Sequence, residues 1–217
     1  MITKPDKRTG VVVKDSNSYI HLLRESSVNA STKFVPGSSE RPIRRVRPPK
    51  YYHPLLDKEK KLDAVVRKIL PEKIADSVCC QGSRLVHLYV QPKTHKQQLA
   101  VRPILSSTNT CNYKLAQWLN DKLKPLSVNQ YTVTNAFEIT KEIRDLNLRD
   151  GDILVSFDVT SLFRNVPLEE TIQILADKAF KDNWFNHTYN LNLSKSDLVE
   201  LLCLATKDQL FQFEGQL

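Results

Sequence analysis

The chain has 217 residues, of which 41% are hydrophobic and 26% are charged, a balance typical of a globular protein with one sizeable core or two small ones. No apolar run approaches the roughly 18 residues of a bilayer-spanning helix, and the N-terminus lacks the apolar stretch of a secretion signal, so the sequence predicts neither. The net charge of +8 is uneven: residues 1–78 carry +8, residues 79–125 carry +6 and residues 126–217 carry −6. A basic first half suits a polyanionic partner, because Lys and Arg displace counterions from phosphates. The alternative is a solvated surface whose charge is merely uneven.

The cysteines and histidines do not have the spacing of a metal site. Cys79, Cys80, Cys111 and Cys203 form no CxxC pair, and no two of the five histidines are four residues apart. We therefore expect reduced thiols in an intracellular protein.

The N-terminal part predicts two short elements followed by an irregular arm. Residues 11–13 are a short strand candidate, and Ser16 or Asn17 is expected to cap a helix that runs to Leu23. Residues 29–53 are rich in Ser, Pro and Arg, and the repeated prolines exclude a continuous helix. A basic run of this kind is typical of nuclear import, so the nucleus is one expected location. The basic side chains of the arm are expected to bind nucleic-acid phosphates, with a plain linker as an equal alternative: Arg44, Arg45, Arg47 and Lys50.

The middle of the chain predicts amphipathic helices around a β-hairpin. Residues 55–70 form a charged helix with one apolar side, and residues 113–126 form another. Between them, residues 85–91 and 99–106 are β-prone and flank a polar loop, so we expect a hairpin. A third helix, residues 135–146, is expected to bury its apolar residues: Phe137, Ile139, Ile143 and Leu146.

The last part contains one acidic residue in a distinctive place. Residues 153–157 are a short β-prone run, and a carboxylate, Asp158, follows directly at its end. Helices are expected from Pro167 and, after a capping box, over residues 194–206, followed by a strand near residues 210–213. A carboxylate held at the end of a strand suits a hard cation such as Mg²⁺. The alternative is an Asp that caps the next turn.

Four blocks of the sequence together carry a family resemblance. They are residues 4–20 (KPDKRTGVVVKDSNSYI), residues 88–107 (LYVQPKTHKQQLAVRPILSS), residues 156–167 (SFDVTSLFRNVP) and residues 208–217 (DQLFQFEGQL). In this order and spacing they resemble the reverse transcriptases of Penelope-like retroelements. The first two blocks are similar to the fingers, the third to motif A of the palm, and the fourth to the approach to the next palm motif.

The resemblance implies an α+β fold, with right-hand polymerase fingers over residues 1–125 and a partial palm over residues 126–217. Within the fingers, residues 1–53 are an N-terminal segment with the basic arm, and residues 54–125 carry the helix and the hairpin. The chain contains no YxDD tetrapeptide. We therefore expect a fragment truncated before that motif, which lacks the rest of the palm, the thumb and the GIY-YIG endonuclease of the family.

The resemblance also implies two-metal nucleotidyl transfer in the complete enzyme. Asp158 matches the catalytic carboxylate that binds Mg²⁺, and Val159 would add its backbone carbonyl. The backbone amides of Ser161 and Leu162 would face the triphosphate. Phe163 matches the residue that excludes a ribose 2′-hydroxyl, with plain core packing as the alternative. With one carboxylate, this chain by itself is expected to bind Mg²⁺ weakly or not at all.

In the predicted hairpin, Arg102 matches the family arginine on the incoming triphosphate, and a guanidinium is apt for binding phosphate oxygens through two parallel bonds. Lys93 matches a lysine that contacts the triphosphate or the template. His95 and Lys96 are expected to be general phosphate contacts in the loop. The alternative for each of these residues is a solvated hairpin tip.

The implied function is that of an RNA-directed DNA polymerase of a retrotransposon, a nucleotidyltransferase. Its partners would be an RNA template, a DNA primer and deoxynucleoside triphosphates, and no membrane. We expect activity from the complete enzyme and not from this chain alone. The alternative is a non-catalytic, nucleic-acid-binding remnant of such an element.

Overall fold

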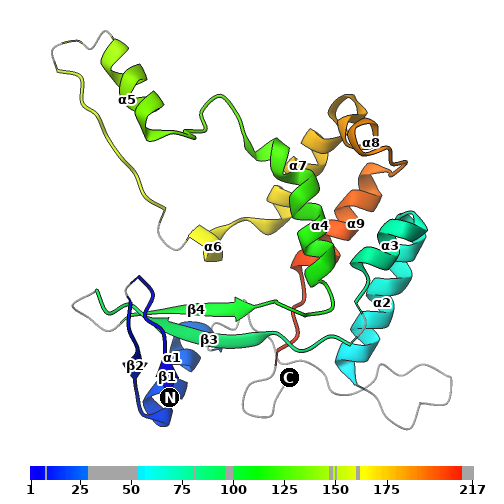
Figure 1. Ribbon diagram of the computed structural model, residues 1–217, viewed down its shortest axis with the longest axis horizontal. Coiled ribbons are helices and arrows are strands. Elements are labelled where there is room, and N and C mark those ends of the chain that lie inside the picture. Colours follow the sequence, from blue (N-terminus) through cyan, green and yellow to red (C-terminus); the bar gives the residue numbers. More distant parts are fainter. Residues whose placement is uncertain are drawn as a thin grey trace. The chain divides into compact units, whose positions relative to one another are not determined.

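The computed structural model describes residues 1–7, 9–28, 53–80, 82–95, 100–146, 149, 151–159 and 162–211. These residues form an α+β fold with many helices and two small antiparallel sheets (Figure 1). The chain divides into two compact units: unit 1 comprises Met1–Trp118 with Cys203–Leu217, and unit 2 comprises Leu119–Leu202. The α+β class expected from the sequence is confirmed. The domain boundaries after residues 53 and 125 stay predictions.

Unit 1 begins with a small sheet and a helix. Strand β1 (Ile2–Thr3) pairs antiparallel with β2 (Val12–Val13). Helix α1 (Ser16–Leu23) follows and continues into the π-helix η1 (Arg24–Val28). The short strand and the helix therefore lie where the sequence predicts them.

The cap of α1 differs from the prediction by one residue. Asp15 is the N-cap, in place of Ser16 or Asn17, and its carboxylate accepts a hydrogen bond of 2.8 Å from the backbone N–H of Ser18. Asp is among the preferred N-cap residues, because its side-chain oxygen reaches one of the first free N–H groups of the helix. Hydrogen bonds from the side chain and then the backbone N–H of Ser18 lower the pKa of Asp15.

The predicted hairpin is confirmed. Strand β3 (His87–Pro92) pairs antiparallel with β4 (Val101–Ser106), with His87 opposite Ser106. One face of this hairpin forms a small core in which Val90 packs with Tyr19 and Leu23 of α1. Leu88 and Val101, on the same face of the pleat, pack against this cluster. This small core thus covers one face of the hairpin, and its side chains do not cover the other face.

The outer edge of β3 is covered by the N-terminal segment. The backbone N–H of Val90 donates to the hydroxyl of Tyr19 at 3.1 Å, and the hydroxyl of Thr3 donates to the carbonyl of Val90 at 3.2 Å. Two residues further along β3, the carbonyl of Pro92 accepts a hydrogen bond of 3.0 Å from the backbone N–H of Asp6. These bonds satisfy polar groups that an edge strand otherwise presents to solvent.

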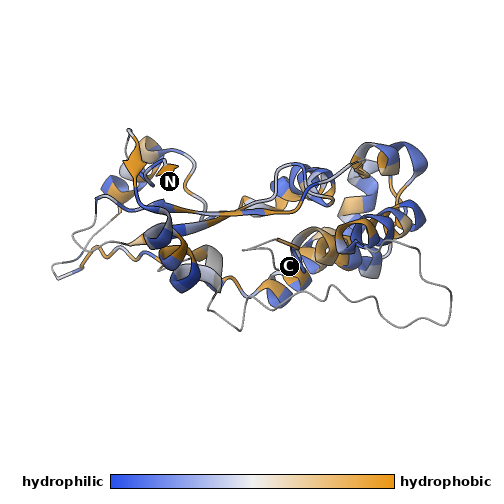
Figure 2. Ribbon diagram, turned by 90° about the horizontal axis from the view of Figure 1, so that it is seen from below, coloured by the Kyte–Doolittle hydropathy of each residue, from blue (hydrophilic) through white to orange (hydrophobic). Residues whose placement is uncertain are grey.

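One of the next two helices of unit 1, α2, lies where the sequence predicts it, and α3 was not predicted. Helix α2 (Pro54–Ile69) begins with proline in its first turn and buries Leu55, Leu62 and Val66, and α3 (Glu72–Val78) packs beside it. Figure 2 shows apolar and polar residues alternating around such helices, as amphipathic helices require. Lys58 of α2 donates to the carbonyls of Lys207 and Asp208. No helix in the described ranges is long and apolar enough to cross a membrane.

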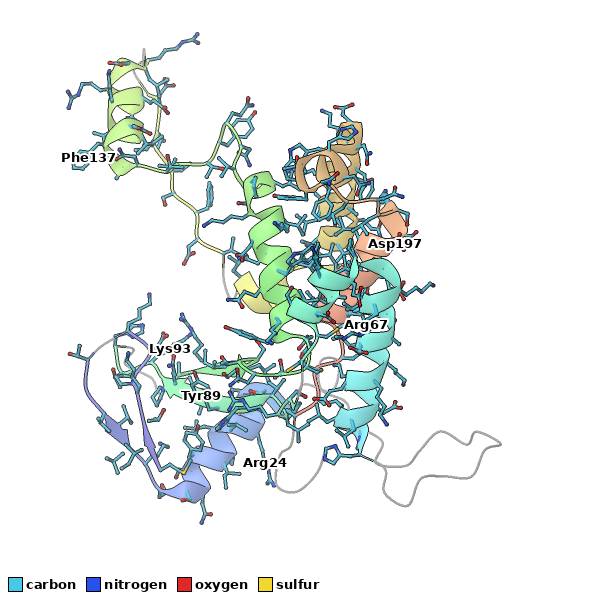
Figure 3. The ribbon with its side chains drawn as sticks, turned by 45° about the vertical axis from the view of Figure 1, so that its right-hand side comes forward. Arg24, Arg67, Tyr89, Lys93, Phe137 and Asp197 are labelled. Atoms are coloured by element: carbon cyan, nitrogen blue, oxygen red, sulfur yellow. The ribbon has the colours of Figure 1, made fainter. Side chains whose placement is uncertain are left out.

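The division of the chain into two units falls within helices α4 (Tyr113–Leu123) and α9 (Lys195–Thr206). The capping box predicted at the start of α9 is confirmed. The carboxylate of Asp197, labelled in Figure 3, accepts from the backbone N–H of Ser194 at 2.8 Å, and the hydroxyl of Ser194 accepts from the backbone N–H of Asp197 at 3.1 Å.

The secondary-structure elements described in unit 2 are all helices. Its buried side chains come mainly from the second half and include Ile172, Ala176, Phe185 and Leu198. Asn186 is also buried there. Its side-chain amide donates a hydrogen bond to the carbonyl of Leu193 and accepts one from the backbone N–H of Leu193. The elements within this unit are η2 (Lys124–Ser127), α5 (Ala136–Asp145), α6 (Leu162–Asn165), α7 (Leu168–Phe180), η3 (Lys181–Asn183) and α8 (Trp184–Tyr189).

Two expectations for unit 2 are wrong in part. The predicted helix over residues 135–146 exists as α5, but it buries no side chain, and Phe137 (Figure 3) is 86% exposed. The predicted strand over residues 153–157 is extended but pairs with no described strand, and Phe157 is 91% exposed. A strand needs a partner for its backbone groups, and a local apolar pattern does not supply one.

The segment expected to form a strand near residues 210–213 pairs, at its start, with the residue just before β3. Phe211 forms an isolated parallel bridge with Val86, and the N–H of Val86 donates to the carbonyl of Leu210 at 3.0 Å. Residues 212–217, which complete the predicted strand, lie outside the described residues. In the described part, this segment therefore adds to the residues just before β3, within unit 1.

Candidate functional site

The open face of the β3–β4 hairpin gathers polar and aromatic side chains. Because side chains alternate across a strand, Tyr89 and Gln91 point to the face of the hairpin that Val90 does not occupy. Arg102 is the cross-strand partner of Gln91 and therefore lies on that same face. The pairing continues past the end of β3, since the backbone N–H of Lys93 donates to the carbonyl of Ala100 at 2.8 Å. Lys93 is therefore a diagonal neighbour of Arg102 on the same face. We call these four residues, Tyr89, Gln91, Lys93 and Arg102, the hairpin face.

Arg102 is held by a partner that the sequence did not reveal. Its Nη1 lies 2.9 Å from Oδ1 of Asp6, and the side chain of Asp6 is 1% exposed while that of Arg102 is 47% exposed. Neither carboxylate oxygen of Asp6 has a hydrogen-bond partner with good geometry among the described residues. The contact is thus an ion pair by distance, between a buried anion and a half-exposed cation.

Lys93 and His95 lie where the hairpin turns. Figure 3 labels Lys93 and Tyr89 on this hairpin. Nδ1 of His95 is buried and has no hydrogen-bond partner within the described part of the chain. Lys96, the other expected phosphate contact, lies outside the described residues.

An aromatic pair extends the hairpin face toward the far end of the strands. The rings of His87 and Tyr89 have centroids 5.9 Å apart and an interplanar angle of 84°, an edge-to-face arrangement. Aromatic rings beside cations form the combination that proteins use to hold bases and phosphates of single-stranded nucleic acid. Sequence reasoning missed Tyr89 and Gln91, although the alternation within the predicted strand already places both on the side of Lys93.

The residues that match motif A lie in unit 2. Asp158 and Val159 are exposed and belong to the extended segment, and Leu162 is the half-exposed first residue of α6. Phe163 is the second residue of α6. Ser161 lies outside the described residues, as do the four basic residues of the arm: Arg44, Arg45, Arg47 and Lys50.

The described residues do not make a magnesium site by themselves. No group of three or more His, Cys, Asp or Glu residues in the described ranges is placed to hold a metal ion. Asp158 and the carbonyl of Val159 would supply two oxygen ligands, whereas Mg²⁺ takes six oxygens in octahedral geometry and keeps several waters. The donor set on the described residues is therefore too small for two ions.

The predicted site residues that the structure describes fall into two groups, one in each unit. Lys93, His95 and Arg102 share one hairpin of unit 1, with Asp6 as an additional member. Asp158, Val159 and Leu162 are close in sequence within unit 2. No protein-family model matches the chain, and no curated protein or solved structure is significantly similar to it.

Proposed function

We propose that the chain is the fingers and the first part of the palm of an RNA-directed DNA polymerase similar to the reverse transcriptases of Penelope-like retroelements. The sequence support is the order of the four blocks that carry the resemblance. The structural observation behind the proposal is that the first two blocks fold against each other. Tyr19 and Asp6, from the first block, bond to Val90 and Pro92 of the second.

In this proposal the hairpin face binds the incoming nucleotide. Arg102 and Lys93 lie on one face and carry two positive charges within reach of a triphosphate. A guanidinium offers a planar set of N–H donors that suits phosphate oxygens, and an ammonium adds a second, more compact charge. Tyr89, on the same face, offers an aromatic ring to a base of the nucleotide or of the template.

The residues that resemble motif A have the remaining roles. Asp158 contributes one carboxylate and Val159 one carbonyl to Mg²⁺, and the further carboxylates would come from a YxDD motif, which the 217 residues do not contain. The backbone at Ser161 and Leu162 faces the triphosphate, and Phe163 selects deoxyribose by occupying the space of a 2′-hydroxyl. Because the ligand set here is too small, we propose no primer extension by this chain alone.

A second candidate is a nucleic-acid-binding protein without catalysis. The observation in its favour is charge: residues 1–125 contain 24 Lys and Arg against 10 Asp and Glu. Such an excess supports binding to a polyanion whether or not chemistry follows. The two candidates share the hairpin face and differ in whether Asp158 matters.

A primer-extension assay separates the two candidates. The chain would be joined to the remaining palm and the thumb of a Penelope-like reverse transcriptase and given an RNA template, a DNA primer and Mg²⁺. We expect incorporation of deoxynucleotides that Asp158→Ala abolishes while template affinity stays nearly unchanged. Phe163→Ala should admit ribonucleotides, and Arg102→Ala should mainly raise the KM for nucleotide. Near-parental activity of Asp158→Ala would exclude the motif A assignment and leave the non-catalytic candidate.

A further inference from the structure

The ion pair between Asp6 and Arg102 joins a buried anion to a half-exposed cation. The distance between Oδ1 and Nη1 is 2.9 Å, and the carboxylate is almost completely removed from solvent. A buried carboxylate loses its hydration, and a paired cation offsets part of that cost. Since neither oxygen of Asp6 has a well-directed hydrogen bond from the described residues, Arg102 is the counter-charge that the structure provides.

Asp6 is itself held in place by the hairpin. Its backbone N–H donates to the carbonyl of Pro92 at 3.0 Å, and Thr3, three residues earlier, donates to the carbonyl of Val90 at 3.2 Å. The carboxylate is thereby anchored along the edge of β3, while Arg102 comes from β4. The ion pair therefore restrains the guanidinium over the hairpin face.

The same geometry leaves part of the guanidinium free for a ligand. Arginine has five N–H donors in one plane, and the 2.9 Å contact with Asp6 involves Nη1. The side chain is 47% exposed, so about half of it is accessible to solvent. Lys93, the diagonal neighbour, adds an ammonium on the same face.

We infer that Asp6 is a positioning residue that fixes Arg102 so that its accessible N–H groups bind the phosphate oxygens of a nucleoside triphosphate. This inference rests on the proposed function and assigns a role to Asp6, a residue of the first block for which the resemblance implied none. A guanidinium restrained before binding loses less conformational entropy when the phosphate arrives. Asp6 itself is negative and repels phosphate, so any gain in affinity from Asp6 must act through Arg102.

That difference in sign makes a double-mutant cycle decisive. Inorganic tripolyphosphate is titrated into the 217-residue chain at low ionic strength, and binding is followed by calorimetry. Arg102→Ala should weaken binding by about tenfold or more, as expected for a lost charge-assisted contact. Asp6→Asn, although it removes a negative charge, should weaken binding by about threefold to tenfold, a typical coupling for residues in contact. In the Arg102→Ala background, Asp6→Asn should cause no further loss.

Other outcomes overturn the inference in distinguishable ways. If Asp6→Asn raises the affinity in both backgrounds, Asp6 is only a repulsive charge. If Arg102→Ala weakens binding and Asp6→Asn does not, the positioning role fails and the proposed nucleotide site stands. If Arg102→Ala has no effect, the assignment of the triphosphate to the hairpin face fails together with the inference.

Two controls keep the test independent of folding. Arg67 and Asp76 form an ion pair of 2.7 Å elsewhere in unit 1, and Arg67→Ala and Asp76→Asn should leave the affinity unchanged. Arg102→Lys keeps the positive charge beside Asp6 but lacks the planar set of donors, so it should lose affinity much as Arg102→Ala does. Full affinity in Arg102→Lys would overturn the need for an oriented guanidinium even if Asp6→Asn failed to fold.

Discussion

Single residues of unit 1 show how burial changes side-chain chemistry. Burial raises the pKa of Cys79 from its ordinary value of 9.0 to about 12, and a hydrogen bond with Asp63 acts in the same direction. Burial also raises the pKa of Cys111 and lowers the pKa of Lys58, a residue of α2 that is partly removed from solvent. All four cysteines are free thiols. Chemical reactivity at these sites is thus set by the surroundings of each group.

Cys79 should be unreactive toward alkylating agents in the folded chain. The thiolate is the nucleophile, and a pKa of about 12 lowers the thiolate fraction at pH 8 about a thousandfold relative to an ordinary thiol. Iodoacetamide labelling at pH 8, followed by peptide mass spectrometry, should show slow modification of Cys79 in the native chain. The same peptide should be labelled rapidly in urea. Equal rates in both states would mean that Cys79 is not buried in solution.

The raised pKa also gives a direction for stability against pH. The unfolded chain loses the Cys79 proton near its ordinary value of 9.0, and the folded chain keeps it until about 12. The unfolded state therefore binds fewer protons in this range, and the free energy of unfolding should fall as the pH rises from about 9 to about 12. Urea titrations at several pH values should show a weaker fall in Cys79→Ala than in the parent chain.

At the scale of elements, what the sequence could predict depends on the range of the interactions. The hairpin of β3 and β4, helix α2 and the capping box of α9 follow from alternation, amphipathic period and neighbouring cap residues, and all lie where predicted. The strand over residues 153–157 depended on a distant partner and is unpaired among the described strands. The ion pair of Asp6 with Arg102 joins residues far apart in the sequence, so no local pattern could reveal it.

Tyr19 should be important for the edge of β3. Its hydroxyl accepts the backbone N–H of Val90 at 3.1 Å in a buried position. Tyr19→Phe leaves that N–H without a partner, a loss of about 1–3 kcal/mol for a buried donor. Hydrogen exchange measured by NMR should then show the Val90 amide exchanging roughly five- to a hundredfold faster, if opening is local.

A matched control for this prediction is a tyrosine in solvent. Tyr131 is 83% exposed, and Tyr131→Phe should leave exchange at Val90 unchanged. Unaltered exchange in Tyr19→Phe would show that the hydroxyl of Tyr19 does not protect the edge of β3 in solution.

At the scale of the whole molecule, charge is separated along the chain. Residues 1–125 carry a net charge of +14, and residues 126–217 carry −6. The basic arm, which lies outside the described residues, contributes four of the positive charges in the first part of the chain: Arg44, Arg45, Arg47 and Lys50. The distribution predicts that the first part of the chain dominates binding to nucleic acid.

Binding to RNA should weaken steeply as salt increases. Each phosphate that a cation neutralises contributes about −0.7 to the log–log slope on single strands and about −0.9 on duplex DNA. A variant with alanine at Arg44, Arg45, Arg47 and Lys50 should therefore have a slope shallower by up to about 3 on single-stranded RNA. Fluorescence anisotropy between low and moderate salt measures this slope.

The matched control removes four exposed cations from the acidic part of the chain: Lys141, Arg144, Lys178 and Lys181. This variant should keep the parental slope. Equal losses in both variants would show that net charge alone governs binding, and a slope near zero in the parent would exclude binding through phosphates.

The extended segment over residues 151–159 has a consequence for handling the protein. Ile153, Leu154, Val155 and Phe157 are all more than half exposed, and no described strand pairs with their backbone. A β-prone apolar segment in this state adds readily to the sheet of another molecule, which is the first step of aggregation. The chain should therefore have limited solubility at high concentration. Holdase chaperones, which bind short extended apolar peptides, should recognise this segment during expression.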